Sequence, residues 1–196
     1  MTAPRPTAAT NQAAQPDTNI YITRFRSLTD PKGEQESYAT WAELCADLEA
    51  QSDQIANKSD GEGWSPVVFS GDTRAKKGAE RISCLVLDYD KGTTSLADAF
   101  DFWAFEAFAP FKKTGFTTGC LVHTSYSHAP EHPKFRVVLP LSRAVDAKEF
   151  EAIWNYVAGL AKEAGHELDA SCKDPSRFWF SGSRSEERRV GKECRS

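Results

Sequence analysis

The alternation of apolar and polar residues predicts a strand near the N-terminus and a helix after it. Residues 20–25, Ile-Tyr-Ile-Thr-Arg-Phe, alternate with a period of two, which places every second side chain on the same face of a strand. From Tyr38 to Ala50 the apolar residues recur at helical spacing. Residues 51–63 are mostly polar and predict a loop.

Short apolar runs between turn residues predict five further strands. The fourth of these runs lies between two prolines, and Pro140 is expected to end it, because proline cannot donate a hydrogen bond to a neighbouring strand. The predicted strands cover residues 66–71, 82–88, 118–125, 135–139 and 177–181.

Two helices are predicted in the second half of the chain. Residues 95–108 carry aromatic side chains on nearly all sides and are expected to lie in the core, with Ser95 or Thr94 as the N-cap. Residues 146–164 have one apolar face, Asp146 as a cap and a glycine at the end. Strands and helices mix without strict alternation, which favours an α+β sandwich over a parallel doubly wound sheet.

The composition narrows the class of protein. The chain has 196 residues, 40% of them hydrophobic, and a net charge of −4, which is typical of one globular domain and argues against a general nucleic-acid binder. It contains no apolar run of about 18 residues and no secretory signal pattern. The five cysteines include no C-x-x-C pair, which favours a reducing cytoplasm.

The two ends of the chain differ from the part between them. Residues 1–18 are rich in Ala, Pro, Thr and Gln and predict a disordered leader. Residues 184–196 have no apolar pattern and resemble the in-frame translation of a sequencing adapter. We therefore expect an artefactual tail on a truncated natural protein, whose downstream domains are missing, and a folded domain over residues 19–183.

The strongest chemical feature is an apolar run that ends in Asp88 and Asp90. Residues two apart on a strand point the same way, and converging carboxylates suit the hard cations Mg²⁺ and Mn²⁺. A third carboxylate would complete a two-metal site of the kind used in phosphoryl transfer. Asp169 is favoured for that place over Asp174, because Asp174 precedes a proline and is typical of a turn.

Basic residues and a histidine in three other segments could bind phosphate. His128 lies in a loop between two predicted strands, Arg136 lies on the second of them, and Arg177 opens the last strand. An imidazole donates a directed hydrogen bond, and a guanidinium binds phosphate through two parallel bonds. A basic loop could also face phosphates, and it contains Arg74, Lys76 and Lys77.

Together, these segments resemble the archaeo-eukaryotic primase superfamily, in particular the primase-polymerase domains of phage and plasmid replication proteins. Asp88 and Asp90 match the superfamily's h-D-h-D/E motif, and His128 matches its histidine motif within Y-S-H-A-P-E-H-P-K-F-R-V-V-L-P-L-S-R. Asp169, eight residues before Arg177, matches its third motif. The residue two before the histidine departs from the pattern, because Tyr126 replaces a small hydroxyl residue.

The resemblance implies a fold and a reaction. The fold would be an RRM-like catalytic core with a mixed or antiparallel sheet and flanking helices. The enzyme would be a template-directed nucleotidyltransferase, a DNA primase or primase-polymerase, acting in phage or plasmid replication. Its partners would be nucleoside triphosphates, a single-stranded DNA template and a downstream helicase domain, with no membrane, in the cytoplasm of a bacterial or phage-infected cell.

The resemblance also implies roles for individual residues. Two Mg²⁺ or Mn²⁺ ions would be held by Asp88, Asp90 and Asp169. The incoming triphosphate would be bound by His128, which also serves catalysis, together with Arg136 and Arg177. Template phosphates would be held by Arg74, Lys76 and Lys77.

Three alternatives remain open. The same acids could serve a metal-dependent nuclease, and the same cations could serve a non-catalytic module that binds single strands. A zinc site is the third alternative, although the spacing of its ligands matches no common zinc pattern. Its ligands would be drawn from Cys120, His123, His128, His132 and Cys172.

Overall fold

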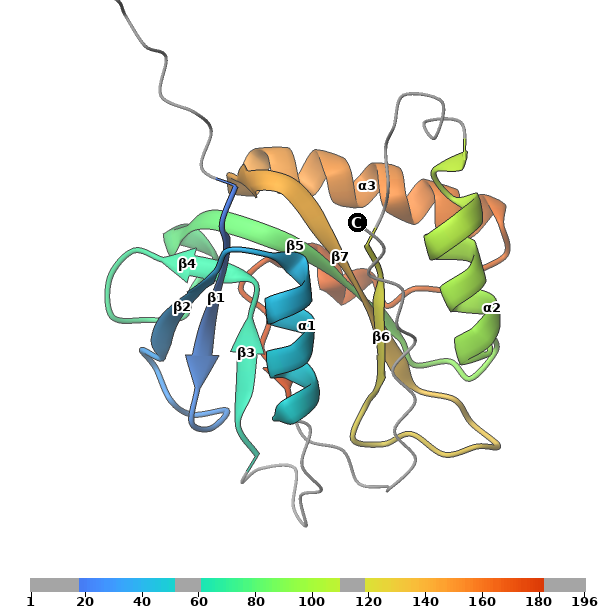
Figure 1. The fold of residues 1–196 in the computed structure, drawn as a ribbon, viewed down its shortest axis with the longest axis horizontal. Helices are drawn as coiled ribbons and strands as arrows, with labels where there is room; N and C mark the ends of the chain where they lie inside the picture. Colours follow the sequence, from blue (N-terminus) through green and yellow to red (C-terminus); the bar gives the residue numbers. More distant parts are fainter. Residues whose placement is uncertain (1–17, 52–60, 110–118, 182–196) are drawn as a thin grey trace, which may run out of the picture.

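The computed structural model describes residues 18–51, 61–109 and 119–181, so the predicted leader up to residue 17 and the predicted tail lie outside the described residues. Two four-stranded sheets form the framework, and all of their strand pairings are antiparallel (Figure 1). The first sheet has the order β2 (Glu34–Tyr38), β1 (Ile20–Phe25), β3 (Gly63–Ser65), β8 (Trp179–Phe180). The second has the order β4 (Val67–Phe69), β5 (Ala79–Tyr89), β7 (Phe135–Val145), β6 (Leu121–Thr124).

Three helices lie against these sheets, which confirms the predicted α+β class. Helix α1 (Trp41–Ala50) follows the first hairpin, and α2 (Leu96–Asp101) continues into a π-helical turn, η3 (Phe102–Glu106). Helix α3 (Ala147–Glu163) runs along the second sheet, and its C-terminal end lies beside α2 (Figure 1). Short 3₁₀ turns occur at η2 (Lys76–Gly78) and η5 (Ala170–Lys173). In the described part of the chain, no helix has both the length and the apolarity that crossing a membrane requires.

The predicted helix caps are present. Ser95 Oγ accepts a hydrogen bond from the amide of Asp98 at the start of α2, and Asp146 Oδ1 accepts two backbone amides at the start of α3. Gly165 follows α3 with φ of +79°, a left-handed conformation that glycine adopts without steric cost.

Several boundaries differ from the sequence-based prediction. The strand β7 continues through Pro140 to Val145, because β6 stops pairing with it at Val138 and leaves one of its edges without a described strand partner. The strand β2 has the sequence Glu-Gln-Glu-Ser-Tyr, which carries no apolar signal, and the prediction missed it. The last strand, β8, pairs only over Trp179 and Phe180.

The core lies between the two sheets and between the second sheet and the helices. Strand β1 packs across β4 and β5, and the Thr23 hydroxyl joins the sheets by donating to the Val67 carbonyl at 2.6 Å. On the other face, Trp103 of η3 is fully buried against the second sheet. Most aromatic residues of the predicted 95–108 helix are therefore in or against the core, as expected, although Phe105 is 45% exposed.

The short length of β4 leaves part of one edge of β5 unpaired in the second sheet, and the candidate site lies at this edge. Strand β4 is short and pairs only with the first part of β5, up to Ile82. Beyond Ile82, the edge of β5 does not pair with β4. The segment around Asp169 lies along this edge, where the Asp169 amide donates a hydrogen bond to the Asp88 carbonyl at 3.0 Å. A residue 81 positions later in sequence thus becomes a neighbour of Asp88.

Candidate functional site

Three polar residues form a row across the second sheet. Asp88 on β5 is paired with Arg136 on β7, and Arg136 is paired with His123 on β6. Directly opposed residues share a face of the sheet, so the three side chains point to the same side, towards the first sheet. Neighbouring residues on these strands are apolar and buried, which makes this row a polar band in an otherwise apolar framework.

Arg177 joins Asp88 to Asp169. Its Nη2 atom lies 2.9 Å from Asp169 Oδ2 and 3.7 Å from Asp88 Oδ2. Asp169 is also the N-cap of η5, where its carboxylate accepts the amide of Ser171 at 2.9 Å. The structure therefore brings Asp88 together with Asp169 and Arg177, which follow it by 81 and 89 positions in the sequence.

Asp174, the other third acid considered, has a different place. Its carboxylate accepts the amide of Ser176 at 2.9 Å and the Ser176 hydroxyl at 2.8 Å, which is the local bonding of a turn. Among the described ion pairs, Arg177 contacts Asp88 and Asp169 but not Asp174.

The two acids differ in electrostatic environment. Burial raises the pKa of Asp88 above its usual value, and the nearby cations Arg136 and Arg177 only partly oppose this effect. Burial also acts to raise the pKa of Asp169, but hydrogen bonds from Ser171 and the charge of Arg177 outweigh it, so the pKa is lowered. Asp88 is thus a buried carboxylate whose charge the protein compensates incompletely.

Asp90 follows β5 and has an oxygen without a hydrogen-bond partner. Its Oδ1 atom is buried and accepts no hydrogen bond within the described residues, although Lys91 Nζ lies 3.8 Å away. Among those residues, no group of three or more His, Cys, Asp or Glu side chains is arranged to hold a metal ion, so the metal site formed by Asp88, Asp90 and Asp169 stays a prediction. The donor set is nonetheless suited to Mg²⁺ or Mn²⁺, because it consists of carboxylate oxygens, one of them buried without a hydrogen bond.

Arg136 requires a correction to the prediction that it lies in the cleft ready to bind a triphosphate. The residue is only 5% exposed, and its Nη1 atom donates to the Phe180 carbonyl at 3.0 Å. Its Nε atom lies 3.5 Å from Asp88 Oδ1, and the guanidinium lies over the Trp179 ring at 5.1 Å. Arg136 therefore supports Asp88 from within the fold, because the strand that carries it is covered by β8.

His128 lies in the loop that joins β6 to β7. The amide of Lys134 donates to His128 Nδ1 at 3.2 Å, so the proton of a neutral imidazole is on Nε2. Nε2 of a neutral His128 can therefore donate a hydrogen bond, and the role of His128 as a phosphate ligand stays a prediction. No contact between His128 and the acids occurs among the described hydrogen bonds and ion pairs.

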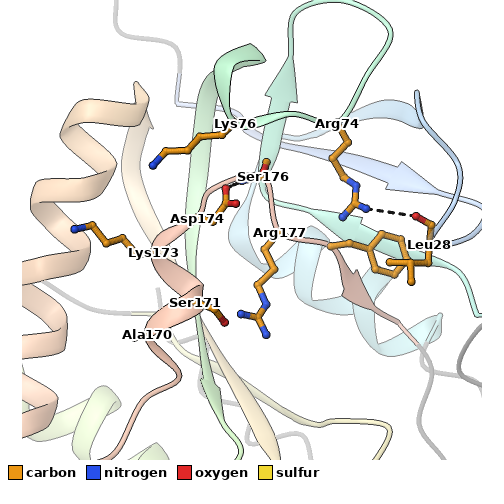
Figure 2. Close-up of a pocket in the computed structure, with 10 residues that line it drawn as sticks. Leu28, Arg74, Lys76, Ala170, Ser171, Lys173, Asp174, Ser176 and Arg177 are labelled. Atoms are coloured by element: carbon orange, nitrogen blue, oxygen red, sulfur yellow. Dashed lines mark hydrogen bonds between the residues drawn. The ribbon is translucent and has the colours of Figure 1, made fainter.

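A cationic pocket with a volume of about 720 Å³ opens beside the acids. Figure 2 shows Arg177 between Lys173 on one side and Arg74 on the other, with Lys76 nearby. Asp174 is the only acid in the lining, and Leu28 and Phe178 provide an apolar part. Arg177 belongs to both the acidic group and this pocket, which makes them one continuous site.

The basic loop that was predicted to bind template phosphates is divided by the structure. Arg74 and Lys76 line the cationic pocket, whereas Lys77 is exposed and is not part of it. Arg74 is placed by a hydrogen bond to the Leu28 carbonyl at 3.4 Å and by the faces of the Phe25 and Phe178 rings. Burial lowers the pKa of Arg74, although the nearby Asp174 acts in the opposite direction.

Two residues of this site were not selected from the sequence. Lys173 reaches the pocket because η5 turns it outwards, and it pairs with Glu151 of α3 at 2.8 Å. His123 was considered only as a zinc ligand, although its position opposite Arg136 places it in the polar row. A prediction of which residues face each other in the 121–138 hairpin could have placed His123 opposite Arg136.

His123 is held neutral. Burial, followed by the charge of Arg136, lowers the pKa of His123 to about 3. Its Nδ1 atom lies 3.3 Å from the Thr124 carbonyl, while Nε2 is buried and has no hydrogen-bond partner among the described residues. Cys120 and Cys172 are buried free thiols, and the described residues contain no cluster of the kind that the zinc alternative requires.

Comparison with known proteins gives one family and one solved structure. The family model for the VapE N-terminal domain matches residues 11–191. The solved structure is the AEP domain of the primase-polymerase of cyanophage S-2L; it shares 15% identity and a TM-score of 0.37, over 83% of this chain and 71% of that chain. No protein with a curated function matches the sequence significantly. The predicted resemblance is confirmed by the family match, which spans most of the chain.

Proposed function

We propose that this chain, which belongs to the VapE N-terminal domain family, is the nucleotidyl-transferring core of a primase-polymerase. The reaction would be template-directed: a 3′-hydroxyl attacks the α-phosphate of an incoming nucleoside triphosphate, and pyrophosphate leaves. The partners would be the triphosphate and a single-stranded DNA template. The reaction would serve phage or plasmid DNA replication, in the cytoplasm.

One observation carries the proposal. Arg177 contacts Asp169 and Asp88 and also lines the cationic pocket. Nucleotidyl transfer needs carboxylates at the reacting phosphate and cations along the rest of the triphosphate. Both kinds of group lie next to Arg177, with the carboxylates on one side and the cationic pocket on the other. Asp88 would be the acid at the reacting centre, because its charge is compensated incompletely.

The carboxylates of Asp88, Asp90 and Asp169 would hold Mg²⁺ or Mn²⁺. Bound there, the metal would supply charge neutralisation at the attacking and leaving oxygens. Arg136 holds Asp88 in place from beneath, through the ion pair and the bond to β8. Arg177 would turn from the acids to the phosphates, because its side chain is 29% exposed and borders the pocket.

The cations of the pocket would bind the triphosphate. Lys173, Arg74 and Lys76 line the pocket around Arg177, so the β- and γ-phosphates would lie among them. His128 would donate its Nε2 proton to a phosphate oxygen, since Nδ1 is already an acceptor. Template binding would then fall to the exposed part of the basic loop, which includes Lys77.

A primer-extension assay tests the proposal. The protein is incubated with a labelled primer on a single-stranded DNA template, with ribo- or deoxynucleotides and with Mg²⁺ or Mn²⁺. The wild type should extend the primer, and Asp88→Asn should abolish extension. Arg177→Ala should mainly raise KM for the nucleotide, about tenfold or more, because a hydrogen bond to a charged group contributes about 1.5–3 kcal/mol.

A matched control is Arg143→Ala, which removes an exposed arginine that pairs with Glu149 outside the pocket. It should leave both kcat and KM unchanged. Shortening of the primer or template without extension would replace the proposal with a nuclease. Binding of single strands that survives Asp88→Asn, with no extension by the wild type, would replace it with a binding module.

A further inference from the structure

A hydrogen-bonded group lies on the other face of the strand that carries the acids. Tyr89 is between Asp88 and Asp90, and its side chain points to the helical side, where it stacks on Phe135 with ring centroids 4.7 Å apart. Its hydroxyl accepts a hydrogen bond from Trp103 Nε1 at 2.8 Å and lies 3.0 Å from His166 Nδ1.

An indole N–H can only donate, so the Tyr89 oxygen accepts from Trp103. We take the Tyr89 proton to be directed to His166 Nδ1, 3.0 Å away, with that nitrogen as the acceptor. His166 is then neutral, with its proton on Nε2. Burial lowers the pKa of His166 and so favours this state, while the acids Asp98 of α2 and Glu106 of η3 act in the opposite direction.

His166 is placed at the start of the segment that leads to the third acid. Its amide donates to the Ala161 carbonyl at 2.8 Å after the left-handed Gly165, and its ring lies 4.5 Å from the Phe102 ring. Asp169 follows three residues later and donates its own amide to Asp88. No sequence motif connects His166 with the acids.

Two hydrogen bonds therefore connect the end of β5 to residues 166–169. One is the side-chain hydrogen bond from Tyr89 to His166, on the face of the second sheet that the helices cover, and the other is the backbone hydrogen bond from Asp169 to Asp88. Arg177 also bridges the two acids, because its Nη2 atom contacts both carboxylates. Without the bond from Tyr89 to His166, the approach of Asp169 to Asp88 depends on the backbone bond and on the Arg177 side chain.

We propose that His166 and Tyr89 are positioning residues, whose hydrogen bond sets Asp169 against Asp88 and thereby sets the affinity of the carboxylates for a divalent cation. The proposal rests on the proposed function only in taking these carboxylates to be the cation ligands. Neither residue touches the substrate, and each acts through the backbone that it holds.

Binding of Mn²⁺ by the intact chain, measured by titration calorimetry without nucleotide, tests this role. His166→Ala removes the acceptor, whereas His166→Asn places an amide oxygen at the position of Nδ1 and keeps it. We expect His166→Ala to weaken Mn²⁺ binding about tenfold, as outer-shell substitutions do, and His166→Asn to stay within about twofold of the wild type. Both variants lose the ring packed on Phe102, so thermal unfolding should change similarly in the two.

A second pair of variants tests the other partner. Tyr89→Phe removes only the hydroxyl and should weaken Mn²⁺ binding like His166→Ala, while Tyr156→Phe, at a 51% exposed tyrosine on α3, should have no effect. In the extension assay, His166→Ala and Tyr89→Phe should lower kcat and leave KM for the nucleotide unchanged, because the cationic pocket is intact.

Equal Mn²⁺ affinity in His166→Ala and His166→Asn, whether both weakened or both unchanged, would overturn the positioning role. An unchanged affinity in Tyr89→Phe would overturn it as well. The failure of the proposed function looks different: the wild type would bind Mn²⁺ and depend on His166 for it, yet extend no primer.

Discussion

Each of the two sheets contains a largely buried arginine, and the two are held in different ways. Arg24, on β1 of the first sheet, contacts two carboxylates and a phenol: Glu36 at 3.0 Å, Asp47, and Tyr38 at 3.2 Å. The Tyr38 hydroxyl in turn donates towards the same acids. Arg136, on β7 of the second sheet, has one carboxylate at 3.5 Å and the carbonyl of Phe180.

The charge states reflect this difference. Burial acts to lower the pKa of Arg24, but its bonds to Glu36 outweigh the burial, and the pKa is raised. Burial lowers the pKa of Arg136, and Asp88 does not compensate for it. Arg24, which contacts two carboxylates, joins β1, β2 and α1 as structure. Under the proposed function, Asp88, whose charge Arg136 compensates incompletely, would instead bind a further cation.

The largest effect is expected from Arg136→Met. The change leaves Asp88 buried beneath β8 without its strand partner, which should lower the free energy of unfolding by about 3–5 kcal/mol. It should also lower primer extension about a hundredfold per folded molecule, since misplacement of a reacting group by about 1 Å has that cost. Urea denaturation and extension rates measure the two effects; extension at the wild-type rate would make Arg136 a purely structural residue.

Arg24→Met should affect stability alone. Glu36 and Asp47 have side chains about a third exposed, so water can solvate them in part after the arginine is lost. We expect a loss of about 2 kcal/mol, between the values for surface and buried ion pairs. Extension by the folded fraction should match the wild type, and a specific loss of extension would contradict the comparison.

The pH dependence of unfolding should reveal His123, the neighbour of Arg136. In the unfolded chain a histidine binds its proton near pH 6.5, whereas the folded state resists it until about pH 3. The unfolded state therefore binds more protons over this range, and stability falls as the pH falls below 6.5, by up to about 1.4 kcal/mol per pH unit. Denaturation of His123→Phe between about pH 5 and 6.5 should show a shallower slope than the wild type.

The smallest effect is expected from Arg26→Ala. Arg26 pairs with Glu34 at 2.8 Å, but both side chains are largely exposed, at 83% and 72%. A surface pair of this kind contributes little, because water solvates both charges equally well when they are apart. Neither the melting temperature nor extension should change, and a clear change in either would show that the edge of the first sheet has a role beyond structure.

The strands, caps and helix ends that were predicted correctly are those that depend on a few consecutive residues. The apolar run up to Asp88, the caps Ser95 and Asp146 and the stop at Gly165 are properties of a few consecutive residues, and the structure has them as predicted. The strand β2 was missed because its residues are charged, and it is held by pairing with β1 rather than by its own apolar pattern.

The composition of the candidate site could also be predicted, but its arrangement could not. Asp88, Asp169 and Arg177 were identified from motifs, and the structure brings these three together. The burial of Arg136 depends on β8; a strand was predicted at residues 177–181, but no local pattern predicts that it pairs with β3 and covers Arg136. The pocket depends on a loop and on two turns that meet only after the sheets have packed.

The sequence by itself determined which residues carry charge and which strands and helices form, because both depend on side chains within a few positions of one another. Only the tertiary structure decided which charges are paired. β4 stops pairing at Ile82 and leaves an open edge at Asp88, and the segment from His166 to Asp169 takes that edge. Pairing of this kind depends on long-range packing, which no local pattern records. It places Asp88 beside Asp169 and Arg177, whereas Arg24 is held by Glu36 and Asp47 near it in the first sheet.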